Sequence, residues 1–219
     1  MKTNLFICGG IILLKLVSPA QAAIVVDNDW TVGTAIPEGN PVGITVSQTF
    51  QGLSIAAISD VTVDLNISGG YNGGLVGYLT LQDANGNMVT ELLLNQVGTT
   101  PANSFGSSGS GFNVTLSDAG TVNGSIHNST GVPTGIWQPD SASTLDGTFG
   151  GLTANGTWTL YLADLTEGGG TSVLNSWGLD ISVVGVPEPT PYGVLAGLSL
   201  VGWLGFNQLR RRASRLLVE

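Results

Sequence analysis

Three segments of the chain alternate between apolar and polar residues with the two-residue period of a half-buried β-strand. In residues 61–67, Val, Leu and Ile occupy every second position, and Thr, Asp and Asn fill the positions between them. The same alternation runs through residues 158–162 and 177–183. Each segment therefore predicts a strand, and the pattern directs Trp158 and Trp177 into the core.

Shorter apolar runs, separated by Gly-rich turns, predict further strands. These are expected near residues 24–32, 42–50, 76–82, 88–94 and 111–117. The dipeptide Asn85-Gly86 lies between two of these runs and is typical of a hairpin turn. No stretch between residues 23 and 184 keeps a helical period over three turns. Many short strands with Gly-rich turns indicate an all-β sandwich or jelly roll.

Two segments lack this alternation and are expected to be loops. Residues 99–111 form a Ser/Gly-rich stretch that predicts a mobile loop. Residues 118–150 are also predicted to be rich in loops, with short apolar anchors. The expected anchors are Ile126, Ile136, Trp137 and Phe149.

The amino-terminal 22 residues have the layout of a secretory signal peptide. Lys2 precedes an apolar run over residues 5–14, which is too short to span a bilayer. Ala20 and Ala22 match the small-x-small cleavage pattern, so we expect signal peptidase to release a chain that starts at Ala23. The alternative is an uncleaved amino-terminal anchor.

The carboxy-terminal region carries a proline motif, an apolar run and a basic cluster, in that order. Residues 185–191 form a Pro-rich linker, 192–209 are long enough for one transmembrane helix, and 210–219 form a basic tail. Arginines at this point are expected on the cytoplasmic side. The motif residues are Val186, Pro187, Glu188, Pro189, Arg210, Arg211 and Arg212. This layout closely resembles the PEP-CTERM sorting signal of Gram-negative bacteria.

The PEP-CTERM resemblance implies export and a specific partner. In that family a membrane protease-transpeptidase, the exosortase, processes the tail. The protein is therefore expected in the inner membrane before processing, and at the cell surface or in the extracellular matrix afterwards. The remaining residues, 23–184, are expected to form one domain, which we call the body.

Charge is distributed unevenly between the body and the two ends. All six Lys and Arg residues lie outside residues 23–209, whereas 14 of the 15 acids lie inside them. The body therefore has no cation that could neutralise phosphates, which excludes nucleic-acid binding. The only cysteine is Cys8, in the signal peptide, so disulfides, thiolate metal sites and a cysteine nucleophile are excluded from the mature chain.

The body also resembles a known family. Residues 155–158 (Asn-Gly-Thr-Trp) and 174–177 (Leu-Asn-Ser-Trp) are similar to motifs of the P domain, or P/Homo B domain, of subtilisin-like proprotein convertases. The resemblance covers residues 36–184 and implies a galactose-binding-like jelly-roll β-sandwich. The family usually has Gly-Asp-Leu where this chain has residues 73–75, and often Gly-Asp where it has residues 169–170.

Catalytic chemistry finds little support in the sequence. The only histidine, His127, lies in a Ser/Asn/Thr/Gly-rich segment and is expected to be a solvated loop residue. A serine–lysine dyad is impossible in a body without lysine. Two carboxylates could still act together, as in glycosidases, but no spacing marks such a pair. We therefore predict a protein that is not an enzyme.

Two binding chemistries stay open. The acids could gather into a calcium site, since calcium prefers oxygen ligands, or they could form a solvated surface. The stretch 83–87 has calcium-loop composition, but its glycine is fourth rather than sixth, which favours a hairpin turn. For sugars, Trp137 and Tyr71 are the best candidates for an exposed platform, but packing at the edge of the core is the favoured interpretation of both.

These observations lead to one leading hypothesis and two alternatives. The leading hypothesis is an exported, non-enzymatic component of the cell surface or of an extracellular polysaccharide matrix. The first alternative is a carbohydrate-binding module. The second is an accessory P domain that acts with a separate subtilisin-like serine protease.

Overall fold

The computed structural model describes residues 23–53 and 55–184. The body forms a compact unit with its own core. The predicted signal peptide with Ala20 and Ala22 lies outside the described residues. So do the whole sorting region from Val186 to Arg212 and the predicted transmembrane helix. In the part of the chain that is described, no helix is long and apolar enough to cross a membrane.

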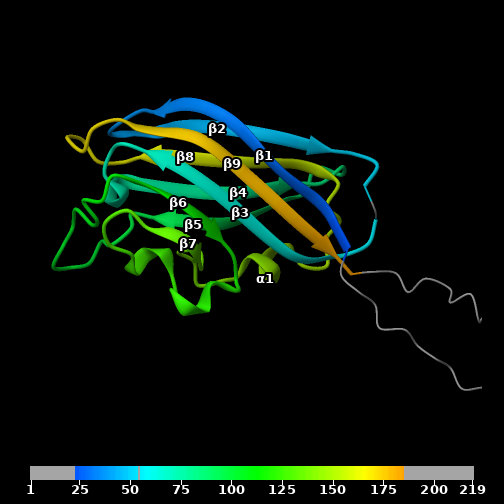
Figure 1. Cartoon of the computed structure of the whole chain (residues 1–219). Coiled ribbons are helices and arrows are strands. Elements are labelled where there is room, and N and C mark those ends of the chain that lie inside the picture. Colours follow the sequence, from blue (N-terminus) through cyan, green and yellow to red (C-terminus); the bar gives the residue numbers. More distant parts are fainter. Residues whose placement is uncertain (1–22, 54, 185–219) are drawn as a thin grey trace, which may run out of the picture. The chain divides into compact units, whose positions relative to one another are not determined.

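The body consists of two facing β-sheets (Figure 1). The five-stranded sheet has the order β1-β9-β3-β6-β7, and the four-stranded sheet has the order β2-β8-β4-β5. The first contains β1 (Ala23–Ile36), β9 (Ser172–Val183), β3 (Ile58–Ser68), β6 (Gly111–Leu116) and β7 (Thr134–Trp137). The second contains β2 (Asn40–Phe50), β8 (Gly156–Asp164), β4 (Leu75–Gln82) and β5 (Met88–Asn95). Neighbouring strands are antiparallel except β6 and β7, which are parallel. The all-β prediction is confirmed.

The core lies between the sheets and is built from the alternating residues. Every apolar residue of the pattern in β3, β8 and β9 is buried. Trp158 packs on Phe149 with ring centroids 5.0 Å apart, and Trp177 packs on Trp30 at 4.9 Å. Both Trp158 and Trp177 are core residues, as the two-residue period predicts.

The predicted hairpin at Asn85-Gly86 joins β4 to β5. Gly86 has φ +86°, a left-handed conformation that glycine adopts without strain. Asp83 accepts hydrogen bonds from the Asn87 side chain and from the backbone N–H groups of Asn85 and Asn87, at 2.8–2.9 Å. Its hydrogen bonds to Asn87, and then to Asn85, lower the pKa of Asp83. The residues that suggest a calcium loop therefore make a turn.

The segment between β6 and β8 contains more regular structure than its sequence predicts. It holds β7, helix α1 (Leu145–Phe149) and the 3₁₀ turns Gly120–Val122 and Ile126–Asn128; a third 3₁₀ turn, Asn72–Gly74, precedes β4. Such short elements depend on tertiary contacts, because four to five residues carry no readable period. The Asp118 carboxylate accepts hydrogen bonds from the first two N–H groups of α1, at 3.0 and 2.8 Å.

Three of the four predicted apolar anchors pack against the core. Ile126 and Phe149 are buried, and Trp137 is partly buried. Ile136 is wrong as an anchor, because it is 51% exposed. It alternates with Trp137 on the short edge strand β7, so only one of the two can face inward.

Candidate functional site

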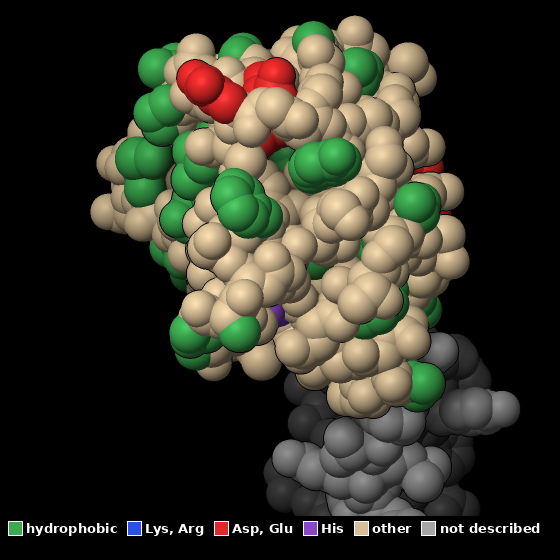
Figure 2. Space-filling model, turned by 90° about the vertical axis from the view of Figure 1, so that its left-hand side faces the viewer, with side chains coloured by type: hydrophobic (Ala, Val, Ile, Leu, Met, Phe, Trp, Pro, Cys, Tyr) green, Lys and Arg blue, Asp and Glu red, His purple; other side chains and the backbone are tan. Residues whose placement is uncertain are grey.

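Four connections meet at one end of the sandwich, which we call the loop end. They join β1 to β2, β3 to β4, β5 to β6 and β8 to β9. Backbone hydrogen bonds of 2.9 Å tie Asn72 to Gly109 and Gly73 to Ser107. Figure 2 views the molecule from this end, where acidic side chains lie beside exposed hydrophobic side chains and no Lys or Arg is seen. The segment that the sequence presents as a mobile loop is thus hydrogen-bonded to its neighbours.

The loop end contains a pocket with two exposed aromatic side chains. Tyr71 is 44% exposed and Phe105 is 74% exposed, and both line a cavity of about 240 Å³. Its other walls are Gly106, Ser108, Thr166, Glu167 and Gly168. A Cβ atom at Gly169 would lie 3.1 Å from the Tyr71 ring, so the glycine lets the ring lie close to the backbone there. Tyr71 is therefore exposed, against the edge-packing interpretation that the sequence favoured.

Carboxylates surround this pocket. Glu167 lies against Gly39, and Glu38 accepts a hydrogen bond from the Gly170 N–H at 2.9 Å. Below them Asp164 is only 1% exposed and accepts a hydrogen bond from the Thr166 N–H at 3.1 Å. Burial raises the pKa of Asp164, and the nearby charge of Glu38 acts in the same direction.

Asp164 lies directly against Gly74. A Cβ at Gly74 would lie 2.1 Å from Asp164 Oδ1, so a side chain at residue 74 and Asp164 cannot occupy the same space. Gly74 therefore leaves the space that the Asp164 carboxylate occupies.

Trp137 does not join Tyr71 in a common platform. Tyr71 lies close after Ser68, which pairs with Gly111 at the start of β6. Trp137 pairs with Leu116 at the other end of that strand, about 17 Å away at 3.3–3.4 Å per residue. Its indole N–H donates to the Thr134 carbonyl at 3.0 Å, and its ring packs against the core. The structure thus confirms the favoured edge-packing interpretation for Trp137, and the two aromatic residues do not form one platform.

Phe105 takes the place that the sequence suggested for Trp137. It escaped prediction because it stands alone in the Ser/Gly-rich segment 99–111, where no apolar period gives it a direction. Only its position could have indicated exposure, because a single aromatic residue without apolar neighbours does not belong to the buried face of a strand.

His127 is not the solvated loop residue that the sequence suggested. Its Nδ1 lies 2.7 Å from Asp140 Oδ2, and its Nε2 lies 2.9 Å from the Thr99 carbonyl oxygen. Both partners accept hydrogen bonds, so the doubly protonated ring satisfies both. Burial lowers the pKa of His127, but the bonds to Asp140 and Thr99 outweigh burial, and the net shift is upward. The imidazole therefore holds two loops together, and neither of its nitrogens faces a nucleophile.

Most acids of the five-stranded sheet lie on its outer face. Asp27 pairs with Asp180, and the side chains of Asp29 and Asp64 lie against Gly178. Burial raises the pKa of Asp180 most, and the charges of Asp27 and Asp64 raise it further. Among the described residues, no group of three or more His, Cys, Asp or Glu side chains could hold a metal ion. Calcium binding through other oxygen ligands stays a prediction.

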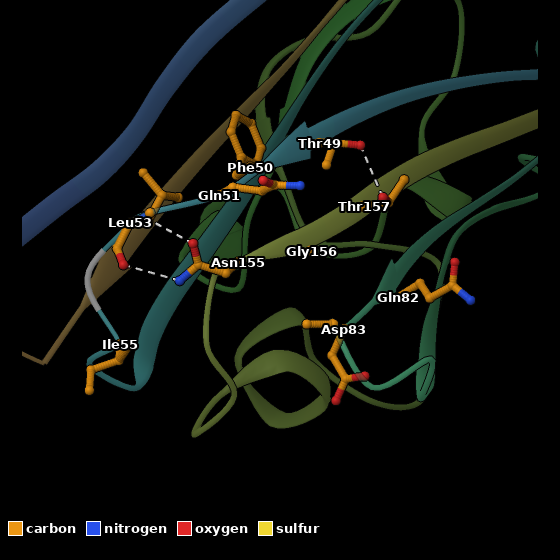
Figure 3. Close-up of a pocket in the computed structure, with 12 residues that line it drawn as sticks. Thr49, Phe50, Gln51, Leu53, Ile55, Gln82, Asp83, Asn155, Gly156 and Thr157 are labelled. Atoms are coloured by element: carbon orange, nitrogen blue, oxygen red, sulfur yellow. Dashed lines mark hydrogen bonds between the residues drawn. The ribbon is translucent and has the colours of Figure 1, made fainter.

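A larger groove lies at the opposite end of the sandwich (Figure 3). Its volume is about 460 Å³, and its walls include Thr49, Phe50, Gln82, Asn155 and Thr157. Asn155 is fixed by two hydrogen bonds to the backbone of Leu53, at 2.8 and 3.1 Å. Asp83 also lines the groove, but its carboxylate is bound within its own turn and points away from Phe50 in Figure 3.

Comparison with known proteins gives only distant structural likeness. No family model matches the chain, and no curated protein matches it. Two solved structures of an Aeromonas sobria serine protease, one of them in complex with its chaperone ORF2, align at 14–15% identity with TM-scores of 0.46 and 0.44. They cover 77% and 74% of this chain, which spans 28% and 27% of the protease chains. The VP2 subviral particle of infectious bursal disease virus aligns at 13% identity over 83% of this chain and 38% of its own, with a TM-score of 0.35.

Proposed function

We propose that the protein is an exported, non-enzymatic component of the cell surface or extracellular matrix, and that its body binds carbohydrate at the loop end. The observation that carries this proposal is the pocket in which Tyr71 and Phe105 stand exposed beside Glu167. A PEP-CTERM signal and an exosortase would deliver the body, and its two sheets would belong to the galactose-binding-like jelly rolls of P domains.

Carbohydrate fits this pocket better than other small ligands do. The two aromatic faces offer apolar contact to the C–H surface of a pyranose ring. Hydroxyl and carboxylate oxygens at Ser108, Thr166 and Glu167 can accept hydrogen bonds from sugar hydroxyls. The nearby acids disfavour anionic ligands such as phosphates, because no Lys or Arg of the body offsets them.

Removal of either aromatic side chain should weaken sugar binding. Burying a Tyr or Phe side chain against a ligand contributes about 1.5–3 kcal/mol, so Tyr71→Ala and Phe105→Ala should each lower affinity by roughly tenfold or more. Isothermal titration of residues 23–184 with a soluble oligosaccharide that the wild type binds would measure this. Val122→Ala is the matched control, because Val122 is exposed but does not line the pocket. Full affinity in both aromatic variants would refute this site.

The delivery part of the proposal predicts a fixed topology before processing. The body should lie in the periplasm and Arg210–Arg215 in the cytoplasm, because positive charge is retained inside. Protease added to spheroplasts of the native host should digest the body and leave a small carboxy-terminal fragment. A body that stays intact in spheroplasts would contradict this topology. The control is to disrupt the inner membrane, after which the protease should digest the body whichever side it lies on.

A further inference from the structure

The two outer faces of the sandwich differ in charge. The strands of the five-stranded sheet carry Asp27, Asp29, Asp60, Asp64 and Asp180, all at least partly exposed. The four-stranded sheet, which the structure describes completely, has only two acids, Glu91 and Asp164, and both are 1% exposed. Its outer face is therefore uncharged in a body that is otherwise strongly anionic.

Hydroxyl groups form a regular array on this uncharged face. Ser47, Thr159, Thr80 and Thr90 lie directly opposite one another across all four strands. Hydrogen bonds link Ser47 to Thr159 at 2.8 Å and Thr80 to Thr90 at 2.9 Å. A hydroxyl has one donor and two acceptor sites, so each pair keeps unused capacity that faces outward.

Tyrosines lie on one side of this hydroxyl row, and the groove lies on the other. On one side lie Tyr161 and Tyr78, paired across β8 and β4 with ring centroids 6.0 Å apart. The Tyr161 hydroxyl donates to the Pro41 carbonyl, which fixes that ring, and Tyr78 is 37% exposed. On the other side lie Thr49, Thr157 and Gln82, which also form the wall of the groove in Figure 3. The tyrosines, the hydroxyl row and the groove are therefore continuous.

We propose that this surface, the neutral face, is a second binding site that takes an extended, uncharged polysaccharide. The tyrosines stack on pyranose rings, the hydroxyl row exchanges hydrogen bonds with sugar hydroxyls, and the groove receives the chain where it leaves the sheet. This site is separate from the loop-end pocket and depends on the proposed function only for the class of ligand.

The chemistry of the neutral face disfavours a second copy of the protein as its occupant. The cores of protein–protein interfaces are enriched in aromatic residues and Met and depleted in Ser. Here a row of one Ser and three Thr crosses all four strands, and Tyr78 and Tyr161 lie on one side of it. A polyhydroxylated ligand satisfies such a row, whereas an apolar protein surface would leave its hydroxyls unpaired.

The acidic face adds a preference among polysaccharides. Anionic polymers such as polyuronates are repelled by the five aspartates of the other sheet and by the acids of the loop end. An uncharged polymer experiences no such repulsion. The two faces together would hold the protein on a neutral polymer with its anionic side outward.

Co-sedimentation with insoluble polysaccharides tests this second site. The probes are microcrystalline cellulose, chitin, curdlan and mannan as uncharged polymers, and insoluble carboxymethyl cellulose as the anionic one. The variants are Tyr78→Ala and the double variant Thr80→Val, Thr159→Val, which keeps β-branched side chains and removes only hydroxyls. Thr31→Val, on the acidic face of β1, is the matched control. Circular dichroism melting verifies that each variant is folded.

We expect the wild-type body to bind at least one uncharged polymer and not the carboxymethyl cellulose. Both neutral-face variants should lose tenfold or more of that affinity, whereas Thr31→Val should keep it. Tyr71→Ala should lose binding of soluble oligosaccharide but still sediment with the polymer, which separates the two sites. Binding to none of the uncharged polymers, or equal binding by folded neutral-face variants, would overturn the proposal. The proposal would also be overturned if the wild type formed a dimer in analytical ultracentrifugation and the neutral-face variants abolished that dimer.

Discussion

Replacement of Trp158 by Ala should unfold the body or come close to it. The side chain is fully buried, packs on Phe149 and donates its indole N–H to the Ala154 carbonyl at 3.0 Å. Truncation of a buried Trp costs about 3–5 kcal/mol, against a total stability of about 5–15 kcal/mol for a typical domain. Trp177→Ala should be similarly severe, because Trp177 packs on Trp30 in the same core. Thermal melting of residues 23–184 measures both.

The conservative replacement by Phe should separate the two tryptophans. Trp158→Phe leaves the Ala154 carbonyl without its donor, whereas Trp177→Phe removes an indole N–H that is buried and has no hydrogen-bond partner. An unpaired buried polar group costs about 1–3 kcal/mol, so its removal offsets part of the lost packing at residue 177. Trp177→Phe should therefore melt higher than Trp158→Phe. The reverse order would contradict these two environments, and Ala variants that melt within a few degrees of wild type would contradict the core itself.

Mild acid should stabilise the body. Burial raises the pKa of Asp140, Asp146, Asp164 and Asp180, and the bonds to Asp140 and Thr99 raise that of His127. A group with a raised pKa binds more protons in the folded state, so its contribution is complete below the unfolded pKa and is lost as pH rises through the folded pKa. For the aspartates this loss begins above about pH 3.8, and for His127 above about pH 6.5. Stability should thus fall from pH 5 to pH 8.

Urea unfolding at constant ionic strength measures this trend. The free energy of unfolding should be higher at pH 5 than at pH 8, and His127→Gln should remove the part of the decline that lies above about pH 6.5. Asp83 acts in the opposite direction, but it lies in a surface turn, so solvent screens its effect. A free energy of unfolding that rises steadily with pH would show that the buried aspartates are stabilised as anions, against this account.

The sequence predicts the long strands and fails where structure depends on distant contacts. In β3, β8 and β9 the two-residue period directly reports which face is buried, because one sheet face meets the core and the other meets water. Strand β7 and helix α1 are too short for any period, and α1 begins where Asp118, more than 25 residues earlier, accepts hydrogen bonds from its first N–H groups. A partner so distant in sequence cannot be recognised from the residues next to α1.

The candidate sites follow the same division. Tyr71 could be named as a candidate because it lies in a Gly-rich turn outside any apolar alternation, but the sequence favoured its packing at the edge of the core. Its pairing with Phe105 depends on the β3–β4 and β5–β6 connections meeting at one end, which only the strand order reveals. The neutral face depends on register, since Ser47, Thr80 and Thr159 become a row only when β2, β8 and β4 pair as they do. The partners of His127, Asp140 and the Thr99 carbonyl, likewise come from segments that only the fold brings together.

The most direct test of the central claim is a glycan array probed with purified residues 23–184, alongside Tyr71→Ala and Phe105→Ala. The account predicts that the wild type binds a set of uncharged glycans, ignores sulfated and uronic-acid glycans, and loses its signal in both variants. A wild-type body that binds no glycan at all, or whose signal is unchanged in both variants, would contradict a carbohydrate-binding body with its pocket at the loop end.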